Sequence, residues 1–154
     1  DLYEAGDGQW LTEYPAPDQA LVPGEERVYN PDATDCVIFS FGNGMPMSLR
    51  AAREIERKHG WKVRVVDLRW LVPLNHAAIA KHAGECDRIL VVDEGRFSAG
   101  IGEGVITAIT EAGFGGKPIR RVVGADTYTP LAGAAFLVIP KDEDIVAAAD
   151  ALAG

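Results

Sequence analysis

The sequence contains neither a long apolar run nor an excess of basic residues. Its 154 residues include 15 Lys and Arg against 23 Asp and Glu, a formal net charge of −8. A membrane-spanning helix needs roughly 18 or more consecutive apolar residues, so we expect no transmembrane segment. The acidic balance disfavours nucleic acid and anionic membrane as partners, and it suits a soluble protein or one that docks a basic partner. The chain also lacks an initiator Met and a signal peptide, and we interpret it as a fragment or a processed chain.

Cysteine and histidine are scarce and are not arranged for chemistry. Cys36 and Cys86 are far apart, and neither belongs to a CxxC motif. We therefore predict two buried, reduced thiols in a cytoplasmic protein rather than a disulfide or a metal site. His76 and His82 are six residues apart, a spacing that puts them on different faces of a helix. A metal site built on this pair is not expected.

Residues 1–34 differ in composition from the rest of the chain. They hold four of the nine prolines and show little hydrophobic periodicity, which is typical of a linker. Residues 26–29 could form a short edge strand, because charged side chains are tolerated at a sheet edge. We place the compact domain at residues 35–154.

Within residues 35–154, short apolar runs alternate with segments of helical periodicity. The predicted strands are 36–41, 63–68, 89–92 and 119–123, and the predicted helices are 46–59, 75–83, 101–113 and 142–152. This alternation predicts an α/β fold with three α/β/α layers and a mostly parallel sheet. In such sheets, ligands and partners meet the loops at the carboxyl ends of the strands.

An acidic pair, Asp93 and Glu94, follows the most apolar of these strands. Such a pair could perform acid–base chemistry if burial raised one pKa. More commonly, carboxylates at a strand end bond loop amides or meet an arginine, and we favour that interpretation. Arg69 and Arg96 are the candidate partners.

Two glycine-bearing loops, Gly42–Gly44 and Gly100–Gly104, precede predicted helices and could each hold an anion. Neither has a complete phosphate motif: the third glycine of GxGxxG would fall on Val105, and the first loop has no Lys-Ser/Thr pair. Glu103 would also repel a pyrophosphate. We favour structural turns, and we keep as the alternative a free-standing α/β module that binds a nucleotide or another anion at these loops.

Four segments together resemble a known family. They read DCVIFSFG at 35–42, VVDLR to VPL at 65–74, ILVVDE with two later glycines at 89–102, and GAD with a proline at 124–130. This set is similar to the C-terminal domain of the transketolase superfamily. The closest likeness is to the beta portion of the thiamine-diphosphate-dependent decarboxylase (dehydrogenase) component of 2-oxoacid dehydrogenase complexes. Residues 1–15 also look like the linker before this domain in chains with fused alpha and beta portions, whereas Ser98-Ala99-Gly100 stands where two glycines are usual.

The resemblance implies a five-stranded, mostly parallel sheet with an antiparallel edge strand at residues 26–29. It implies a C-terminal assembly domain, of the pyruvate or branched-chain dehydrogenase kind. In the complete enzyme, which would oxidatively decarboxylate a 2-oxo acid, thiamine diphosphate and magnesium are held by the preceding domains. This fragment is therefore expected to bind neither cofactor and to be inactive alone. The implied partners are the preceding domains, further copies in a homodimer or higher oligomer, and a lipoyl-bearing acyltransferase.

We predict that the loops 94–100 and 126–130 lie at one end of the sheet, since both follow parallel strands. They carry aromatic side chains beside charges, a combination that anchors many protein interfaces. The alternative is that Phe97 folds inward over the helix start. The candidate interface residues are Glu94, Arg96, Phe97, Asp126 and Tyr128.

Overall fold

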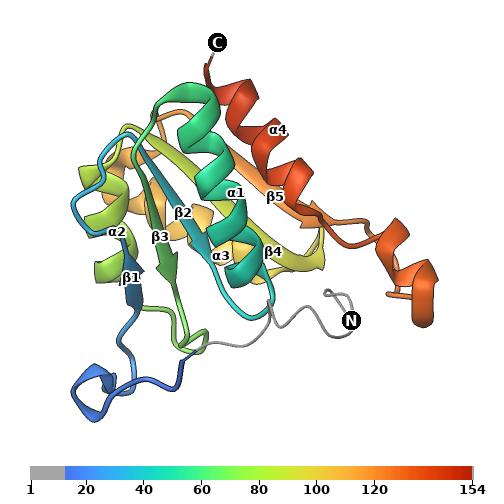
Figure 1. The fold of residues 1–154 in the computed structure, drawn as a ribbon, viewed down its shortest axis with the longest axis horizontal. Helices are drawn as coiled ribbons and strands as arrows, with labels where there is room; N and C mark the ends of the chain where they lie inside the picture. Colours follow the sequence, from blue (N-terminus) through green and yellow to red (C-terminus); the bar gives the residue numbers. More distant parts are fainter. Residues whose placement is uncertain (1–12, 154) are drawn as a thin grey trace.

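The computed structural model, shown in Figure 1, describes residues 13–153. Its five-stranded sheet has the order β1-β3-β2-β4-β5, with β1 antiparallel to β3 and the other pairs parallel. The strands are β1 Arg27–Tyr29, β2 Cys36–Ser40, β3 Val63–Asp67, β4 Arg88–Arg96 and β5 Ile119–Gly124. The predicted fold class, including the antiparallel edge strand, is confirmed. The resemblance of the first twelve residues to a linker concerns positions outside the described range.

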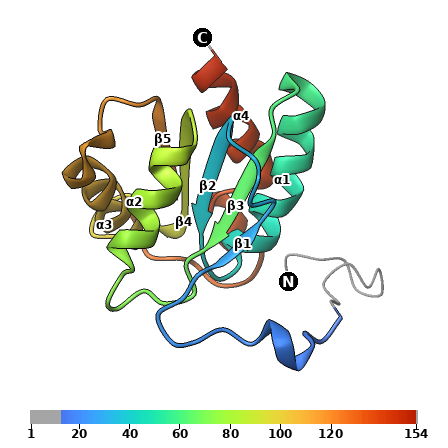
Figure 2. The same ribbon diagram turned by 90° about the vertical axis from the view of Figure 1, so that its left-hand side faces the viewer.

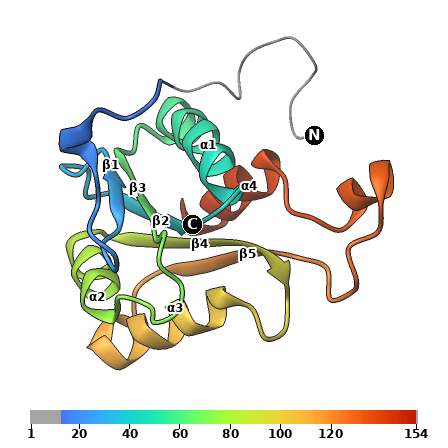
Figure 3. The same cartoon turned by 90° about the horizontal axis from the view of Figure 1, so that it is seen from below.

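Two helices cover each face of the sheet (Figures 2 and 3). One face carries α1 Gly44–His59 and α4 Asp142–Ala153, and the other carries α2 His76–Glu85 and α3 Ile101–Ile109. Alternate residues of β4 serve the two cores: Leu90 and Val92 face α1 and α4, whereas Ile89 and Val91 face α2 and α3. Strands covered on both faces are mostly apolar, which is why the central ones were recognisable as apolar runs.

The helix boundaries follow local signals in the sequence. The side-chain oxygen of Asn75 accepts a hydrogen bond from the Ala78 amide at 3.1 Å and caps α2. Gly60 ends α1 in the left-handed conformation, with φ at 71°. Ser48 of α1 is buried, whereas Leu49 is only partly buried.

Two connections project from the layered body. The first is the strap, residues 13–26, which precedes β1 and contains a short 3-10 helix, η1 Pro17–Gln19. The second is the arm, residues 125–138, which leaves β5 and carries the 3-10 helix η3 Ala132–Leu137 away from the body before α4 begins (Figures 1 and 3). The Ala125 amide donates to the Val138 carbonyl at 2.8 Å, and this bond closes the base of the arm. No residue of η3 is buried.

Candidate functional site

The loops after β4 and β5 are joined at the carboxyl end of the sheet. The Ser98 amide donates to Oδ1 of Asp126 at 3.3 Å, and the Ser98 hydroxyl donates to Oδ2 at 2.6 Å. These two bonds from Ser98, helped by the charge of Arg96, lower the pKa of Asp126. The predicted juxtaposition of the two loops is therefore confirmed.

Asp93 caps the helix on one face of the sheet. Its side chain is buried, and its two oxygens accept from the amides of Gly95 at 2.7 Å and Gly102 at 2.8 Å. Gly102 lies in the first turn of α3, where a carboxylate also complements the positive end of the helix dipole. The favoured bonding to loop amides is confirmed for Asp93. Arg69 and Arg96 were wrong as its partners: Arg69 instead lies 3.7 Å from the Asp67 carboxylate, because it follows β3, which β2 separates from β4 in the sheet.

Three glycines enclose the Asp93 carboxylate. A Cβ atom at Gly95 would lie 2.8 Å from Oδ1, and Cβ atoms at Gly100 and Gly102 would lie 2.6 and 3.3 Å from Oδ2. A real Cβ does not approach another heavy atom as closely as the first two distances require. The glycine pattern in the loop before α3 thus makes room for an internal carboxylate, which occupies the place that a bound phosphate would take.

Glu94 meets the helix on the opposite face, because successive strand residues point to opposite sides of a sheet. Both the side chain and the backbone of Asn43, the residue before α1, hydrogen-bond to the half-buried Glu94 carboxylate. Burial, with a smaller effect from the Asp93 charge, raises the pKa of Glu94, and the bonds from Asn43 partly oppose it. Asp93 therefore bonds to the start of α3 on one face of the sheet, and Glu94 bonds to the start of α1 on the other face.

This arrangement does not fit a diphosphate or its metal ion. Both glycine loops already face a carboxylate of the protein, so a diphosphate there would meet like charge. Within residues 13–153, no three His, Cys, Asp or Glu side chains are grouped so that they could hold a metal ion.

None of the described helices is long and apolar enough to cross a membrane.

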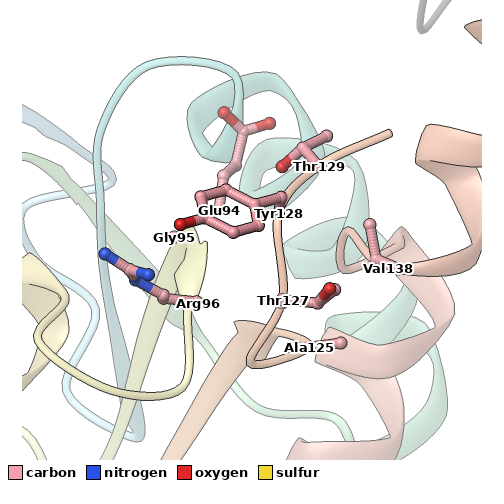
Figure 4. A pocket seen from close by; sticks show the side chains of 9 residues that line it. Glu94, Gly95, Arg96, Ala125, Thr127, Tyr128, Thr129 and Val138 are labelled. Carbon is pink, nitrogen blue, oxygen red and sulfur yellow. The ribbon is translucent and has the colours of Figure 1, made fainter. Parts of the chain in front are cut away.

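A hollow of about 240 Å³ lies between the carboxyl end of β4 and the base of the arm. Figure 4 shows Tyr128 beside Glu94, with Arg96 on one side of the pair and Val138 on the other. Tyr128 itself is 90% exposed, so the hollow is open. Four of the five predicted interface residues, all but Phe97, thus line or adjoin one surface hollow.

Phe97 is 59% exposed, with the Arg121 guanidinium 4.7 Å from its ring centre. The alternative in which Phe97 folds inward over the helix start is therefore wrong. The arginine lies over the ring because Arg121 of β5 also reaches Glu103 of α3, at 3.5 Å.

Exposed apolar side chains extend well beyond the predicted residues. Among residues 13–153, every large exposed hydrophobic side chain lies in the strap, in the loops after β3 and β4, or in the arm, all at the carboxyl end of the parallel strands. The strap belongs to this end because β1 runs antiparallel to β3. We call this set the apolar end; it comprises Tyr14, Leu21, Val22, Trp70, Val72, Phe97, Tyr128, Leu131, Phe136 and Leu137. The sequence analysis did not predict Leu131, Phe136 and Leu137 as interface residues. They belong to an apolar run without strand or helix periodicity, and such a run could have indicated an exposed apolar segment.

Comparisons with known proteins agree with this architecture. The sequence profile of the family described as transketolase, C-terminal domain, matches residues 25–145. The chain belongs to this family. The transketolase C-terminal domain accounts for β1 as well as the parallel strands, since the match begins ahead of Arg27.

This transketolase C-terminal domain is similar in sequence to curated dehydrogenase subunits. It is 32% identical over 117 residues to the pyruvate dehydrogenase E1 component subunit beta of Staphylococcus aureus, covering 75% of this chain and 36% of the relative. The subunit of the same name from Staphylococcus epidermidis is 32% identical over 122 residues, which is 78% of this chain and 37% of the relative. The chain thus spans little more than a third of the length of these relatives.

Two solved structures share the fold of this transketolase C-terminal domain. A split-gene transketolase, described as an inactive beta4 tetramer, superposes with a TM-score of 0.76 at 24% identity, covering 93% of this chain and 46% of that one. A 2-oxoglutarate:ferredoxin oxidoreductase from Magnetococcus marinus superposes with a TM-score of 0.57 at 16% identity, covering 84% of this chain and 20% of that one.

Proposed function

We propose that this chain is the C-terminal assembly domain of a thiamine-diphosphate-dependent 2-oxoacid dehydrogenase. The complete enzyme would decarboxylate a 2-oxo acid and pass the acyl group to lipoamide. The similarity to E1 component beta subunits supports this proposal. In this proposal thiamine diphosphate and magnesium are bound by the preceding domains, and the isolated chain is inactive and cytoplasmic.

The observation that carries the proposal is the confinement of exposed apolar side chains to one end. A soluble monomer rarely gathers large apolar side chains in one region, and a cluster of this kind usually marks an interaction site. The strap approaches β1 from the same end, so a domain preceding it would lie next to the apolar end. We propose that residues 1–34 are the linker to that domain, with β1 completing the sheet, and that 35–154 form the compact domain.

The five predicted residues divide into two roles in this proposal. Phe97, Tyr128 and Arg96 are exposed and would contact the partner. Asp126 joins the loops after β4 and β5 through Ser98, and Glu94 joins the end of β4 to Asn43 before α1. The partners we propose are the preceding domains, further copies of the enzyme in a homodimer or higher oligomer, and the lipoyl-bearing acyltransferase. The net charge of −8 would favour a basic docking surface on the last of these.

The test uses the full-length parent enzyme with Arg96→Glu and Phe97→Ala combined. We expect the double variant to keep its circular dichroism spectrum but to assemble less completely in sedimentation velocity, with a matching loss of activity. Lys62→Glu is the matched control, since Lys62 is exposed at the opposite end of the sheet. Unchanged assembly and activity in the double variant would refute the assembly role.

A further inference from the structure

The edge strand β1 is held by a buried cluster of charged side chains that the assembly role does not use. Glu26 immediately precedes β1, Arg64 belongs to β3, and His82 belongs to α2. Arg64 and His82 are each 3% exposed. We call these three residues the edge clamp.

The geometry of the edge clamp sets the protonation of His82. Nδ1 of His82 lies 2.9 Å from Nη1 of Arg64, and a guanidinium can only donate, so Nδ1 must be the unprotonated acceptor. Nε2 lies 3.2 Å from Oε1 of Glu26, which can only accept, so Nε2 carries the hydrogen. The closed clamp therefore requires neutral His82 in the Nε2–H form.

The edge clamp fixes the chain on both sides of β1. Arg64 also donates from Nε to the Ala33 carbonyl at 3.1 Å, beyond the end of β1. Before β1, the Asn75 amide donates to the Gly24 carbonyl at 3.0 Å and to Oε2 of Glu26 at 3.4 Å. Since β1 pairs with β3 over only three residues, these side-chain bonds supply much of what holds the edge.

We propose that the edge clamp is a proton-operated latch, in which protonation of His82 at Nδ1 loosens β1 while β2, β4 and β5 stay folded. A proton on Nδ1 removes the acceptor of Arg64 and brings two cations into contact, so the guanidinium moves away from His82 and from the Ala33 carbonyl that follows β1. The bond from Nε2–H to Glu26 is kept as an ion pair. The latch does not depend on the assembly role, because its residues lie at the edge of the sheet opposite β5.

The charges around His82 set the direction of the pH dependence. Burial lowers the pKa of His82; the bond to Glu26 opposes this, and the charges of Arg64 and Lys81 add to it. Glu85 of α2 bonds Arg64 from the other side. The pKa of His82 is lower when the clamp is closed, so the open form binds more protons. The clamp is therefore intact above about pH 6.5 and weakens as the pH falls below that value.

Hydrogen exchange of the whole chain followed by mass spectrometry tests the latch. We compare peptides covering β1 and β4 at about pH 7.5 and about pH 5.5, after correction for intrinsic exchange rates. Because the open form binds more protons, protection of β1 should be lower at about pH 5.5 than at about pH 7.5, whereas protection of β4 should not change. Equal protection of β1 at both pH values, or equal loss in β1 and β4, would overturn the proposal.

His82→Asn is the matched variant, because an amide oxygen can accept from Arg64 but cannot be protonated. Its β1 protection should not change between the two pH values, and the pH response of the wild type persisting in this variant would overturn the latch. Imidazole ¹⁵N shifts of the wild type near pH 7.5 give a reading that does not depend on the variant folding. They should report the Nε2–H form, and the Nδ1–H form would refute the geometry on which the latch is built.

Discussion

At the scale of single residues, the two thiols show how burial controls reactivity. Cys36 and Cys86 are both free and buried. Burial, with a further contribution from Cys86, raises the pKa of Cys36 to about 12, and burial raises the pKa of Cys86 as well. The thiolate is the reactive form, so both groups should be inert in the folded protein.

We therefore predict that the native chain does not react with a thiol reagent near pH 8, and that two groups react after denaturation without reductant. Colorimetric thiol counting in buffer and in denaturant measures both values. One rapidly reacting native thiol would contradict the burial of these groups, and a denatured count of zero would indicate a disulfide.

A second residue-scale prediction concerns Lys117, whose ammonium donates to three carbonyls at the end of α2. The distances are 2.8 Å to Ala83, 2.9 Å to Gly84 and 2.6 Å to Cys86. Charged hydrogen bonds and the helix dipole both act here, so Lys117→Met should lower the free energy of unfolding by about 1.5–3 kcal/mol. Urea denaturation measures the change, with Lys62→Met as an exposed control. Equal midpoints for the two variants would count against this account.

At the scale of elements, the glycines around Asp93 define how β4 meets α3. Gly100→Ala should destabilise the protein strongly, because its Cβ would lie 2.6 Å from the Asp93 carboxylate. Asp93→Ala alone should cost about 2–4 kcal/mol, since it leaves two amides without their acceptor. In the double variant the clash is gone, so the cost of Gly100→Ala should shrink. A double-mutant cycle by urea denaturation tests this coupling, and strictly additive effects would refute it.

The arm gives a prediction of the opposite kind. Leu131 and Leu137 are 91% and 84% exposed, so replacing both with Asp should change the free energy of unfolding by only about 0.5 kcal/mol. The same variant should weaken assembly of the complete enzyme, since these side chains belong to the apolar end. Thermal unfolding of the chain and sedimentation velocity of the parent enzyme measure the two effects. A large loss of stability would show that the arm packs on its own domain.

The same elements show what the sequence could and could not predict. Runs such as Ile89–Val92 identified the central strands because burial on both faces leaves no polar position. The end of β4 was placed too early, since Asp93 and Glu94 are polar, yet they are accommodated by the starts of α3 and α1. Which helix start each carboxylate meets depends on packing across the sheet, and no spacing along the chain encodes it. The loop pair was predictable, because parallel strands bring their carboxyl ends together, whereas the arm had no periodicity to reveal it.

At the scale of the whole molecule, charge and apolar surface are distributed differently. The formal charge of −8 makes copies of the chain repel one another at neutral pH, whereas burial of the apolar end favours their association. Self-association of the isolated chain should therefore increase with salt concentration, as screening removes the repulsion. Sedimentation velocity across a salt series measures it. Association that decreases with salt would indicate that ion pairs, not apolar contacts, hold the copies together.

The direction of α4 has a practical consequence for binding measurements. This helix starts beside the arm and ends at Ala153, at the end of the sheet opposite the apolar end (Figure 1). A biosensor chip that captures the molecule through a tag after α4 would present Phe97, Tyr128 and the arm to the flowing analyte. Capture through a tag ahead of the strap would instead turn those side chains towards the chip. The orientation of the immobilised domain would then decide whether a partner is detected at all.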